Sequence, residues 1–383
     1  MPQTVSPTAT LPADNVRITA TGVELVLPDG RPAYFNACWL RDNCATSFDR
    51  ETRERTFDIF HLAQEPHPQS ARIAGDMLEI EWAGEAHVSR YPLAWLAGYA
   101  QGARRADPAD LPRRAWYADH YAGLARFRHA DLIADPGAVA QWLRAVIVEG
   151  VAIVTDMPDS DAGLTDLVRL MGHVRPTFFG EYFDVTTHIA PTNLAYTAKA
   201  LELHTDTPAE DMAPGVQFLH CRSNSVSGGD NLFLDGVAVA NDLRAQYPDD
   251  FRLLAETAVP FYCEHDTYDV RSRQRVIELD DHGEVSGVTI SQHMADVFDL
   301  PQHQLDAYYP AFCRFGRMLQ DDKYVMRFRL GAGECIVFDN HRIVHGRAAY
   351  SATSGERYLR GCYADRGEMR STYRALVGEG RFK

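Results

Sequence analysis

The first hundred residues alternate apolar and polar positions in short runs. Residues 16–19 and 23–27 alternate around tight turns, and residues 77–82 form another alternating run. A period of two places one face of a strand in the core. Residues 92–99 have helical spacing instead. We therefore expect a small β-rich N-terminal domain at residues 14–101, preceded by a disordered lead-in at residues 1–13.

The rest of the chain begins with helical patterns and then becomes rich in strands. Residues 102–124 are polar and contain prolines, which indicates a linker. Pro136 suits the first position of a helix with apolar positions at 139–148, and residues 151–155 predict a buried strand. Further apolar runs predict strands at 216–221, 232–234, 276–279, 285–290, 326–330, 335–338 and 358–363. Residues 125–383 are therefore expected to form a mainly β domain with flanking helices, a β-sandwich or jelly roll.

Composition narrows the classes of partner and compartment. The 383 residues carry a formal net charge of -15, which argues against a nucleic-acid partner. No apolar run approaches the roughly 20 residues that cross a bilayer, and the N-terminus has no secretory-signal pattern. The seven cysteines are scattered and form no Cys-x-x-Cys pair, which favours a reducing, cytoplasmic setting.

One histidine–carboxylate motif has the form that non-haem iron enzymes require. Such sites use two histidines and one carboxylate on one face of Fe(II), which leaves adjacent positions for the co-substrate and O2. His204-Thr205-Asp206 follows a short alternating run, so both side chains can face one ion. His345, which follows a distant predicted strand, is the expected third ligand.

Other histidines compete for these roles. His129-Ala130-Asp131 lies at a predicted helix start, where Asp131 complements the helix dipole. His282-Gly283-Glu284 lies in a turn, and His341 is a rival for the third ligand within an Asp-Asn-His-Arg turn.

Downstream of His345, Arg357 heads a predicted strand. A planar guanidinium is the best partner for the far carboxylate of 2-oxoglutarate, which indicates this co-substrate. The alternative role for Arg357 is a surface ion pair.

Five blocks of sequence resemble one known family. They are LAYTAKALELHTD (194–206), PGVQFLHC (214–221), SGGDNLFLDG (227–236), FDNHRIVHGR (338–347) and RYLRGCYAD (357–365). Together they are similar to the γ-butyrobetaine hydroxylase-like family of the taurine-dioxygenase-like Fe(II)/2-oxoglutarate enzymes. The resemblance covers nearly the whole chain. It implies a double-stranded β-helix catalytic domain. It also implies that the protein hydroxylates a C–H bond.

The same resemblance implies roles for individual residues. His204, Asp206 and His345 would bind iron, Arg357 would hold the 2-oxoglutarate tail, and Asn231 would contact the co-substrate. The family binds a trimethylammonium group in an aromatic cage, because ring faces are the natural partners of such a group. The resemblance implies that four aromatic residues of this chain form the cage. It also implies that two further residues contact the anionic end of the substrate. The substrate-binding residues implied are Phe179, Phe183, Tyr196 and Tyr363 for the cage, and Asn193 and Ser291 for the anion.

Two departures from the family pattern carry expectations of their own. The family's N-terminal zinc site uses three cysteines and a histidine, but only Cys44 and His87 match, with Thr46 and Asp49 at the other places. Since tetrahedral zinc prefers four thiolate or imidazole ligands, we expect no structural zinc. The anion-binding segment reads Ile-Ser-Gln-His at 290–293, which would suit a larger or more highly charged anion.

These observations rank the candidate functions. The first is hydroxylation of γ-butyrobetaine to carnitine, and the alternative is hydroxylation of 2-(trimethylammonio)ethylphosphonate at C1. Trimethyllysine hydroxylation, a non-catalytic binding protein on the same fold and a cupin-like metal hydrolase rank lower. The resemblance also implies a homodimer.

Overall fold

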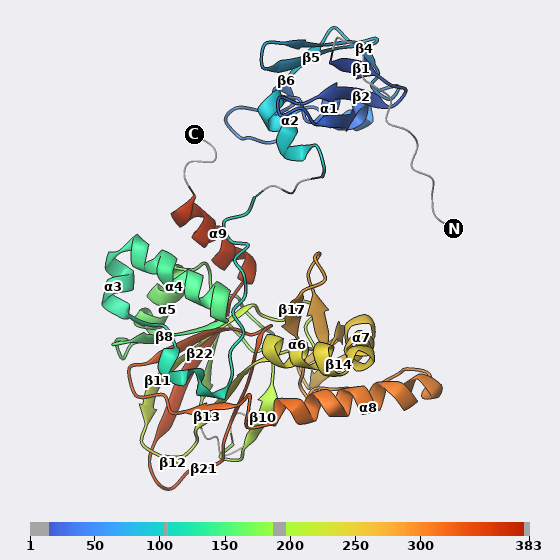
Figure 1. The fold of residues 1–383 in the computed structure, drawn as a ribbon. Helices are drawn as coiled ribbons and strands as arrows, with labels where there is room; N and C mark the ends of the chain where they lie inside the picture. The colour runs from blue at the N-terminus through green and yellow to red at the C-terminus, as the bar shows by residue number, and fades with distance from the viewer. Residues whose placement is uncertain (1–14, 103, 105, 187–196, 379–383) are drawn as a thin grey trace. The chain divides into compact units, whose positions relative to one another are not determined.

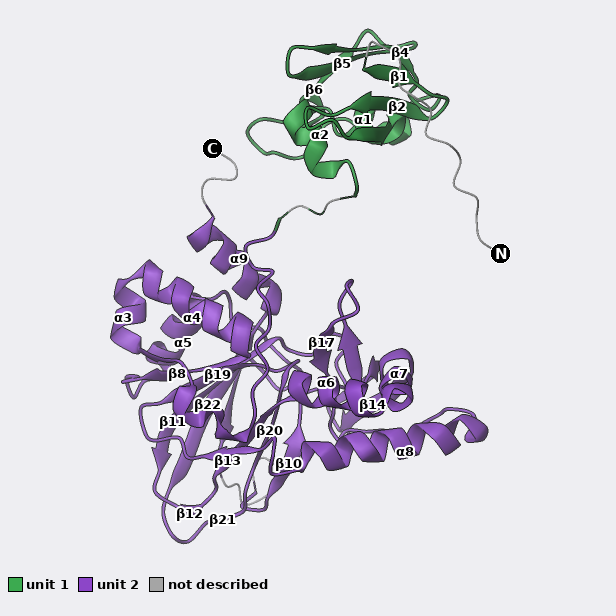
Figure 2. Cartoon of the chain, viewed as in Figure 1, with its two compact units in different colours: residues 1–106 green, residues 107–383 purple. Residues whose placement is uncertain are grey.

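The protein, represented by a computed structural model, is described over residues 15–102, 104, 106–186 and 197–378. The chain divides into two compact units, Met1–Ala106 and Asp107–Lys383. Figure 2 distinguishes the two units by colour. Each unit has its own buried apolar clusters, so each is described by itself.

Unit 1 consists of two three-stranded antiparallel sheets and two short helices. Val23 and Leu25 of one sheet and Leu78, Ile80 and Trp82 of the other alternate with outward residues and are buried in one cluster. The alternation seen in the sequence therefore becomes a two-sheet core. The elements are β1 Val16–Ile18, β2 Gly22–Val26, β3 Pro32–Asn36, α1 Ala37–Asp42, β4 Pro68–Ala74, β5 Met77–Trp82, β6 Val88–Pro92 and α2 Leu93–Tyr99.

Unit 2 is built on two sheets. The larger has the order β7 Arg126–Arg128, β8 Val151–Thr155, β19 Cys335–Asp339, β11 Val216–Asn224, β22 Arg357–Ala364 and β9 Tyr182–Val185. The smaller has the order β10 Leu201–His204, β20 Ile343–Arg347, β13 Asn231–Asp235 and β18 Met326–Phe328. Leu219 and Phe338 of the larger sheet share one buried cluster with Phe233 and Met326 of the smaller. Two sheets with a shared interior confirm the predicted jelly-roll fold.

Helices cover the other face of the larger sheet (Figure 1). They are α3 His129–Ala134, α4 Pro136–Glu149, α5 Asp161–Arg169 and α9 Arg366–Val377. The side chain of Asp135 caps α4 by accepting the backbone N–H groups of Gly137 and Ala138. Pro136 occupies the start of this helix as expected, and Gly150 ends it with φ +80°. Trp142 of α4 packs edge-on against Phe218 of the sheet.

A long insertion separates β13 from β18. It contains α6 Gly236–Gln246, α7 Pro248–Glu256, the hairpin β14 Ala258–His265 and β15 Tyr268–Arg275, β16 Ile277–Leu279, β17 Val285–Val288 and α8 Gln302–Leu319. The short pair β12 Ser227–Gly228 and β21 Tyr350–Ser351 completes the strands. Among the described residues, none of the helices combines the length and apolar character that a membrane crossing needs. The insertion matters for function because its hairpin reaches the cavity described next.

Candidate active site

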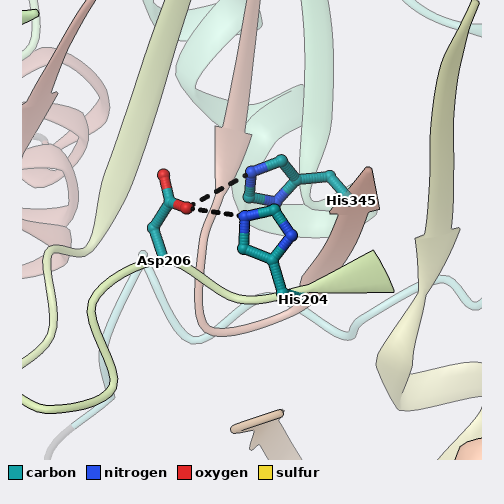
Figure 3. A group of neighbouring side chains, drawn as sticks. All are labelled: His204, Asp206 and His345. Carbon is teal, nitrogen blue, oxygen red and sulfur yellow. Dashed lines mark hydrogen bonds and ion pairs between the residues drawn. The ribbon is translucent and has the colours of Figure 1, made fainter. Parts of the chain in front are cut away.

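Two neighbouring strands bring His204 and His345 together. The strands β10 and β20 pair antiparallel, with His204 directly opposite His345. Nε2 of His204 lies 3.0 Å from Oδ1 of Asp206, and Nε2 of His345 lies 3.6 Å from the same oxygen. Figure 3 shows both rings turned toward this carboxylate. Over the ranges that the structure describes, this is the one group of three or more His, Cys, Asp or Glu residues that could hold a metal ion.

Hydrogen bonds orient the side chain of His204 and the backbone of Asp206. Nδ1 of His204 lies 2.7 Å from the Glu202 carbonyl oxygen, which requires the proton on Nδ1 and leaves Nε2 as the free ligand atom. The amide side chain of Asn340 accepts the Asp206 N–H at 2.7 Å and donates to the Asp206 carbonyl at 3.1 Å. Asn340 thus fixes the backbone of Asp206, a role that the FDNHRIVHGR block did not reveal on its own.

The charges of the site suit a divalent cation. Burial alone would raise the pKa of Asp206, but His345, His204 and the hydroxyl of Tyr363 outweigh it and hold that pKa far below its usual range. Burial lowers the pKa of His345 to about 4, although Asp206 opposes the shift. At neutral pH the carboxylate is therefore ionised and His345 is neutral, which are the forms that bind metal.

Arg357 is a buried cation, and two of its nitrogen atoms have no hydrogen-bond partner among the described residues. It begins β22, its side chain is 7% exposed, and these two nitrogen atoms are Nε and Nη1. Burial, with a contribution from nearby Arg347, lowers its pKa to about 10, so it remains charged. A buried guanidinium without a carboxylate partner is costly unless an anion binds to it. This position therefore suits an anionic ligand.

Arg347 is a second cation that the sequence analysis missed. It ends β20, two residues after His345, and therefore lies on the same side of the strand. Its Nη2 donates to the carbonyl groups of Thr197 at 2.6 Å and Lys199 at 2.7 Å. The spacing from His345 was the signal that could have identified it. Arg347 connects the metal-site strand to the segment that follows residues 187–196.

These groups line one cavity of about 350 Å³. Its wall includes His204, Asp206, His345, Asn231, Arg347 and Arg357, together with several aromatic rings. Asn231 is buried, and its amide nitrogen donates to the Phe328 carbonyl at 3.4 Å. The candidate iron-binding and co-substrate residues therefore share one space.

Three of the predicted cage residues form one aromatic wall of this cavity. The ring centroids of Phe183 and Tyr363 are 5.2 Å apart and those of Phe179 and Phe183 are 5.7 Å apart. Gly361 makes this arrangement possible, since a Cβ there would lie 2.3 Å from Cζ of Phe183. Glycine is required here because the phenylalanine ring lies directly on the backbone of β22.

Other predicted site residues have different outcomes. Asn193 and Tyr196 lie outside the described residues. Ser291 is buried, with its Oγ 3.4 Å from the ring nitrogens of His293, and it is His293 and not Ser291 that lines the cavity. The rival His341 instead places Nε2 3.1 Å from the Ala213 carbonyl, away from the metal-binding group.

Gln217 is a further polar residue of the cavity. It lies on β11 opposite Tyr363, is 2% exposed, and its Oε1 has no hydrogen-bond partner among the described residues. The signal in the sequence was a single amide within the apolar run Val-Gln-Phe-Leu. Its carboxamide is available to a bound ligand.

The residues considered for zinc lie in unit 1. Sγ of Cys44 is 3.4 Å from Nε2 of His87 and 3.2 Å from Oγ1 of Thr46. The carboxylate of Asp49 instead accepts the backbone N–H groups of Glu51 and Thr52. The absence of structural zinc stays a prediction, which metal analysis of the purified protein would test.

Comparison with known proteins places the chain in a family. The model of the taurine catabolism dioxygenase TauD, TfdA family matches residues 118–363. The γ-butyrobetaine dioxygenase of Pseudomonas sp. (strain AK-1) is 34% identical over 358 residues, which cover 92% of this chain and 93% of that protein. The human γ-butyrobetaine dioxygenase is 30% identical over 371 residues, with 92% and 94% covered. A solved structure of the non-haem iron oxygenase OrfP with Fe and α-ketoglutaric acid aligns with a TM-score of 0.46 and 14% identity, covering 62% of this chain and 83% of that one.

The family match covers most of the second unit, and both relatives extend over nearly the whole chain. The His–Asp–His group, the unpartnered guanidinium and the shared cavity agree with that assignment. The chain therefore belongs to the taurine catabolism dioxygenase TauD, TfdA family and is an Fe(II)- and 2-oxoglutarate-dependent dioxygenase.

Proposed function

We propose that this enzyme hydroxylates γ-butyrobetaine to give carnitine. The observation that carries the proposal is one cavity that combines a metal-binding group, a buried unpartnered arginine and an aromatic wall. The two relatives of greatest identity reported above are both γ-butyrobetaine dioxygenases, which supports the choice of substrate.

The donor set of the cavity fits the metal and its co-substrate. His204, Asp206 and His345 supply two nitrogens and one oxygen, the set typical of non-haem Fe(II), and their ligand atoms lie within 4.8 Å of one another. When bound, Fe(II) with 2-oxoglutarate and O2 supplies the oxidative chemistry of hydroxylation. Arg357 binds the far carboxylate of 2-oxoglutarate with its unpartnered donors, and Asn231 contacts the same molecule.

The aromatic wall selects the cationic end of the substrate. A trimethylammonium group has no N–H to donate, so it is bound by ring faces. Phe179, Phe183 and Tyr363 provide these faces, and Tyr196 completes the cage in this proposal. The distance between the cage and the residues that bind the anionic end decides which carbon faces the metal. The resemblance assigns that end to Asn193 and Ser291, of which Ser291 does not line the cavity.

One observation favours a second substrate, 2-(trimethylammonio)ethylphosphonate. His293 lines the cavity two residues after Ser291, so this segment offers an imidazole, in place of a single amide, to the anionic end of a phosphonate. Trimethyllysine differs from γ-butyrobetaine in its longer chain and its additional α-ammonium group.

Side-by-side turnover of γ-butyrobetaine, the phosphonate and trimethyllysine, measured as substrate-dependent succinate formation, tests the proposal. We expect γ-butyrobetaine to give the highest kcat/KM and Asp206→Ala to abolish turnover of all three. Preference for the phosphonate would replace the first substrate by the second. Turnover of an amine-free sulfonate, together with no turnover of these three compounds, would contradict the proposed aromatic cage.

A non-catalytic binding protein is distinguished by Fe(II) titration under anaerobic conditions. We expect a metal-to-ligand charge-transfer band when 2-oxoglutarate is present and none when it is omitted. Absence of the band in both cases would contradict the iron and co-substrate assignments. This measurement does not depend on knowing the substrate.

We also propose a homodimer and a cytoplasmic, reducing location. The seven cysteines are all free, which supports a reducing compartment. Light scattering at several protein concentrations tests the dimer, and cell fractionation tests the location. A molecular mass equal to one chain at all concentrations would contradict the homodimer.

A further inference from the structure

The hairpin β14–β15 forms part of the cavity although it belongs to neither sheet of the jelly roll. Its strands pair in register from Ala258 with Arg275 to His265 with Tyr268. Cys263, Glu264 and Tyr268, near the turn, line the same cavity as the metal-binding group. Neither the sequence motifs nor the proposed reaction gives this part of the hairpin a role.

A continuous series of aromatic rings connects the hairpin to the metal site. The ring of Tyr268 lies 4.6 Å from that of Phe178, between centroids, and Phe178 lies 5.0 Å from Phe179. From Phe179 the series continues through Phe183 to Tyr363, whose hydroxyl donates to Asp206. The aromatic wall therefore extends two rings beyond the predicted cage, toward the end of the hairpin.

The charges of the cavity differ between its hairpin side and its arginine side. Apart from Asp206, Glu264 is the only carboxylate among the described residues that line the cavity, whereas Arg347 and Arg357 line another part of it. Asp266 and Asp269 are close to Glu264 at the hairpin turn, and no Lys or Arg occurs between residues 264 and 270. Arg271 lies 3.8 Å from Glu264, but it pairs at 2.6 and 2.8 Å with Asp269.

We propose that Phe178 and Tyr268 form an outer subsite for the quaternary ammonium group of the substrate, which it occupies before it reaches the cage, and that Glu264, on the other face of the hairpin, contributes through its negative charge. Ring faces attract a cation that cannot donate a hydrogen bond. The acidic turn raises the local concentration of such a cation and disfavours anions. This inference rests on the proposed trimethylammonium substrate, and it adds residues that govern substrate capture.

The test compares Tyr268→Ala with Tyr268→Phe, which keeps the ring face, and with Glu264→Gln. We expect Tyr268→Ala to lower kcat/KM for the trimethylammonium substrate by about three- to tenfold, with kcat and the co-substrate KM unchanged. Tyr268→Phe should stay within about twofold of the unaltered protein. Glu264→Gln should lower kcat/KM at low ionic strength, with the difference disappearing at high salt, because salt screens exposed charges.

A binding measurement separates substrate capture from chemistry. Calorimetry on the metal-free protein should show weaker binding of choline to Tyr268→Ala, and no change for its neutral isostere 3,3-dimethylbutan-1-ol. Equal losses for both compounds, or a raised co-substrate KM, would assign Tyr268 a structural role and overturn the subsite. If the unaltered protein turns over trimethylammonium substrates but all three variants match it, only the subsite fails. If the unaltered protein accepts no such substrate, the proposed function fails first.

Discussion

Tyr363 donates its phenolic hydrogen to Oδ2 of Asp206 at 2.7 Å, while Oδ1 of the same carboxylate faces both histidines. Burial, followed by the negative charge of Asp206, raises the pKa of Tyr363 well above its ordinary value, so the hydroxyl remains a donor. One side chain therefore has two functions. Its ring belongs to the proposed cage, and its hydroxyl fixes the carboxylate as a ligand through a single oxygen.

The first prediction separates these two functions by Tyr363→Phe. The ring stays, so the KM for the trimethylammonium substrate should change by less than about twofold. Loss of the hydrogen bond to the carboxylate should weaken metal binding about tenfold, as is typical for residues that orient a ligand. Calorimetric titration with Mn(II) under anaerobic conditions measures the effect. Unchanged metal affinity, or a substrate KM raised as much as the metal dissociation constant, would contradict the division of roles.

The control is Tyr358→Phe, on the same strand. Its hydroxyl donates to Asp184 at 3.1 Å, and neither residue belongs to the metal-binding group. We expect this variant to bind Mn(II) as the unaltered protein does. Both variants remove one tyrosine hydroxyl that donates to a carboxylate, so a difference between them reflects the place of Tyr363 beside the metal site.

Much of the fold followed from local patterns in the chain. The alternation of apolar and polar residues predicted β5 Met77–Trp82 with its observed bounds. A continuous apolar run predicted the buried strand β8 Val151–Thr155. The strand β20 Ile343–Arg347 was not predicted, because His345 and Arg347 interrupt its apolar pattern in order to face the cavity. The polar residues that identify the site are therefore also the reason why this strand was not predicted.

The cavity could be predicted only in part, since its contacts join distant segments. The motif spacing indicated His204, Asp206 and His345, and the structure brings all three together. Nothing local in the sequence indicated that Tyr268 of the hairpin meets Phe178, because this contact depends on how the insertion packs. His204 and His345 are recognisable from their motifs, whereas Tyr268 belongs to an insertion in which no motif was recognised.

The second prediction concerns Arg357, whose burial without hydrogen-bond partners for Nε and Nη1 among the described residues should reduce stability in the absence of ligand. Arg357→Met removes a desolvated cation, so the ligand-free variant should melt at the same temperature as the unaltered protein or higher. The co-substrate KM should rise about 10- to 100-fold, since hydrogen bonds to charged groups contribute about 1.5–3 kcal/mol. Thermal melts with and without 2-oxoglutarate and Mn(II), together with steady-state kinetics, measure both effects.

Arg360→Met is the matched control for that experiment. Arg360 lies three residues along the same strand and pairs with Asp184 at 2.8 Å. Its substitution should leave the co-substrate KM unchanged and should not raise the melting temperature. A similar rise in this KM for both variants would show that Arg357 does not bind 2-oxoglutarate specifically.

The third prediction uses the close contact between Gly361 and Phe183. A methyl group at residue 361 would overlap the ring, so Gly361→Ala should displace Phe183 from the aromatic wall. We expect the substrate KM to rise about three- to thirtyfold, the range of one cation–ring contact, with the co-substrate KM nearly unchanged. Gly367→Ala in α9 is the control, because no atom lies within 4 Å of the added Cβ. Equal effects of the two substitutions on substrate KM would contradict the packing role of Gly361.

The last prediction concerns His220, which does not line the cavity. It lies on β11, is fully buried, and neither ring nitrogen has a hydrogen-bond partner among the described residues. Burial, helped by Arg222, lowers its pKa from 6.5 to about 4. Between these values the unfolded chain binds more protons than the folded one, so the free energy of unfolding falls as the pH is lowered from about 6.5 toward 4.

His220→Leu removes this titration. One group shifted in this way accounts for about 1–2 kcal/mol of lost stability at pH 5, so the melting temperature of the variant should fall less between pH 7 and pH 5. His293 and His345, whose pKa values burial also lowers to about 4, keep part of the slope. The exposed His303 of α8 provides the control His303→Leu, which should retain the full pH dependence. Parallel curves for all three proteins would show that His220 is not a source of the acid sensitivity.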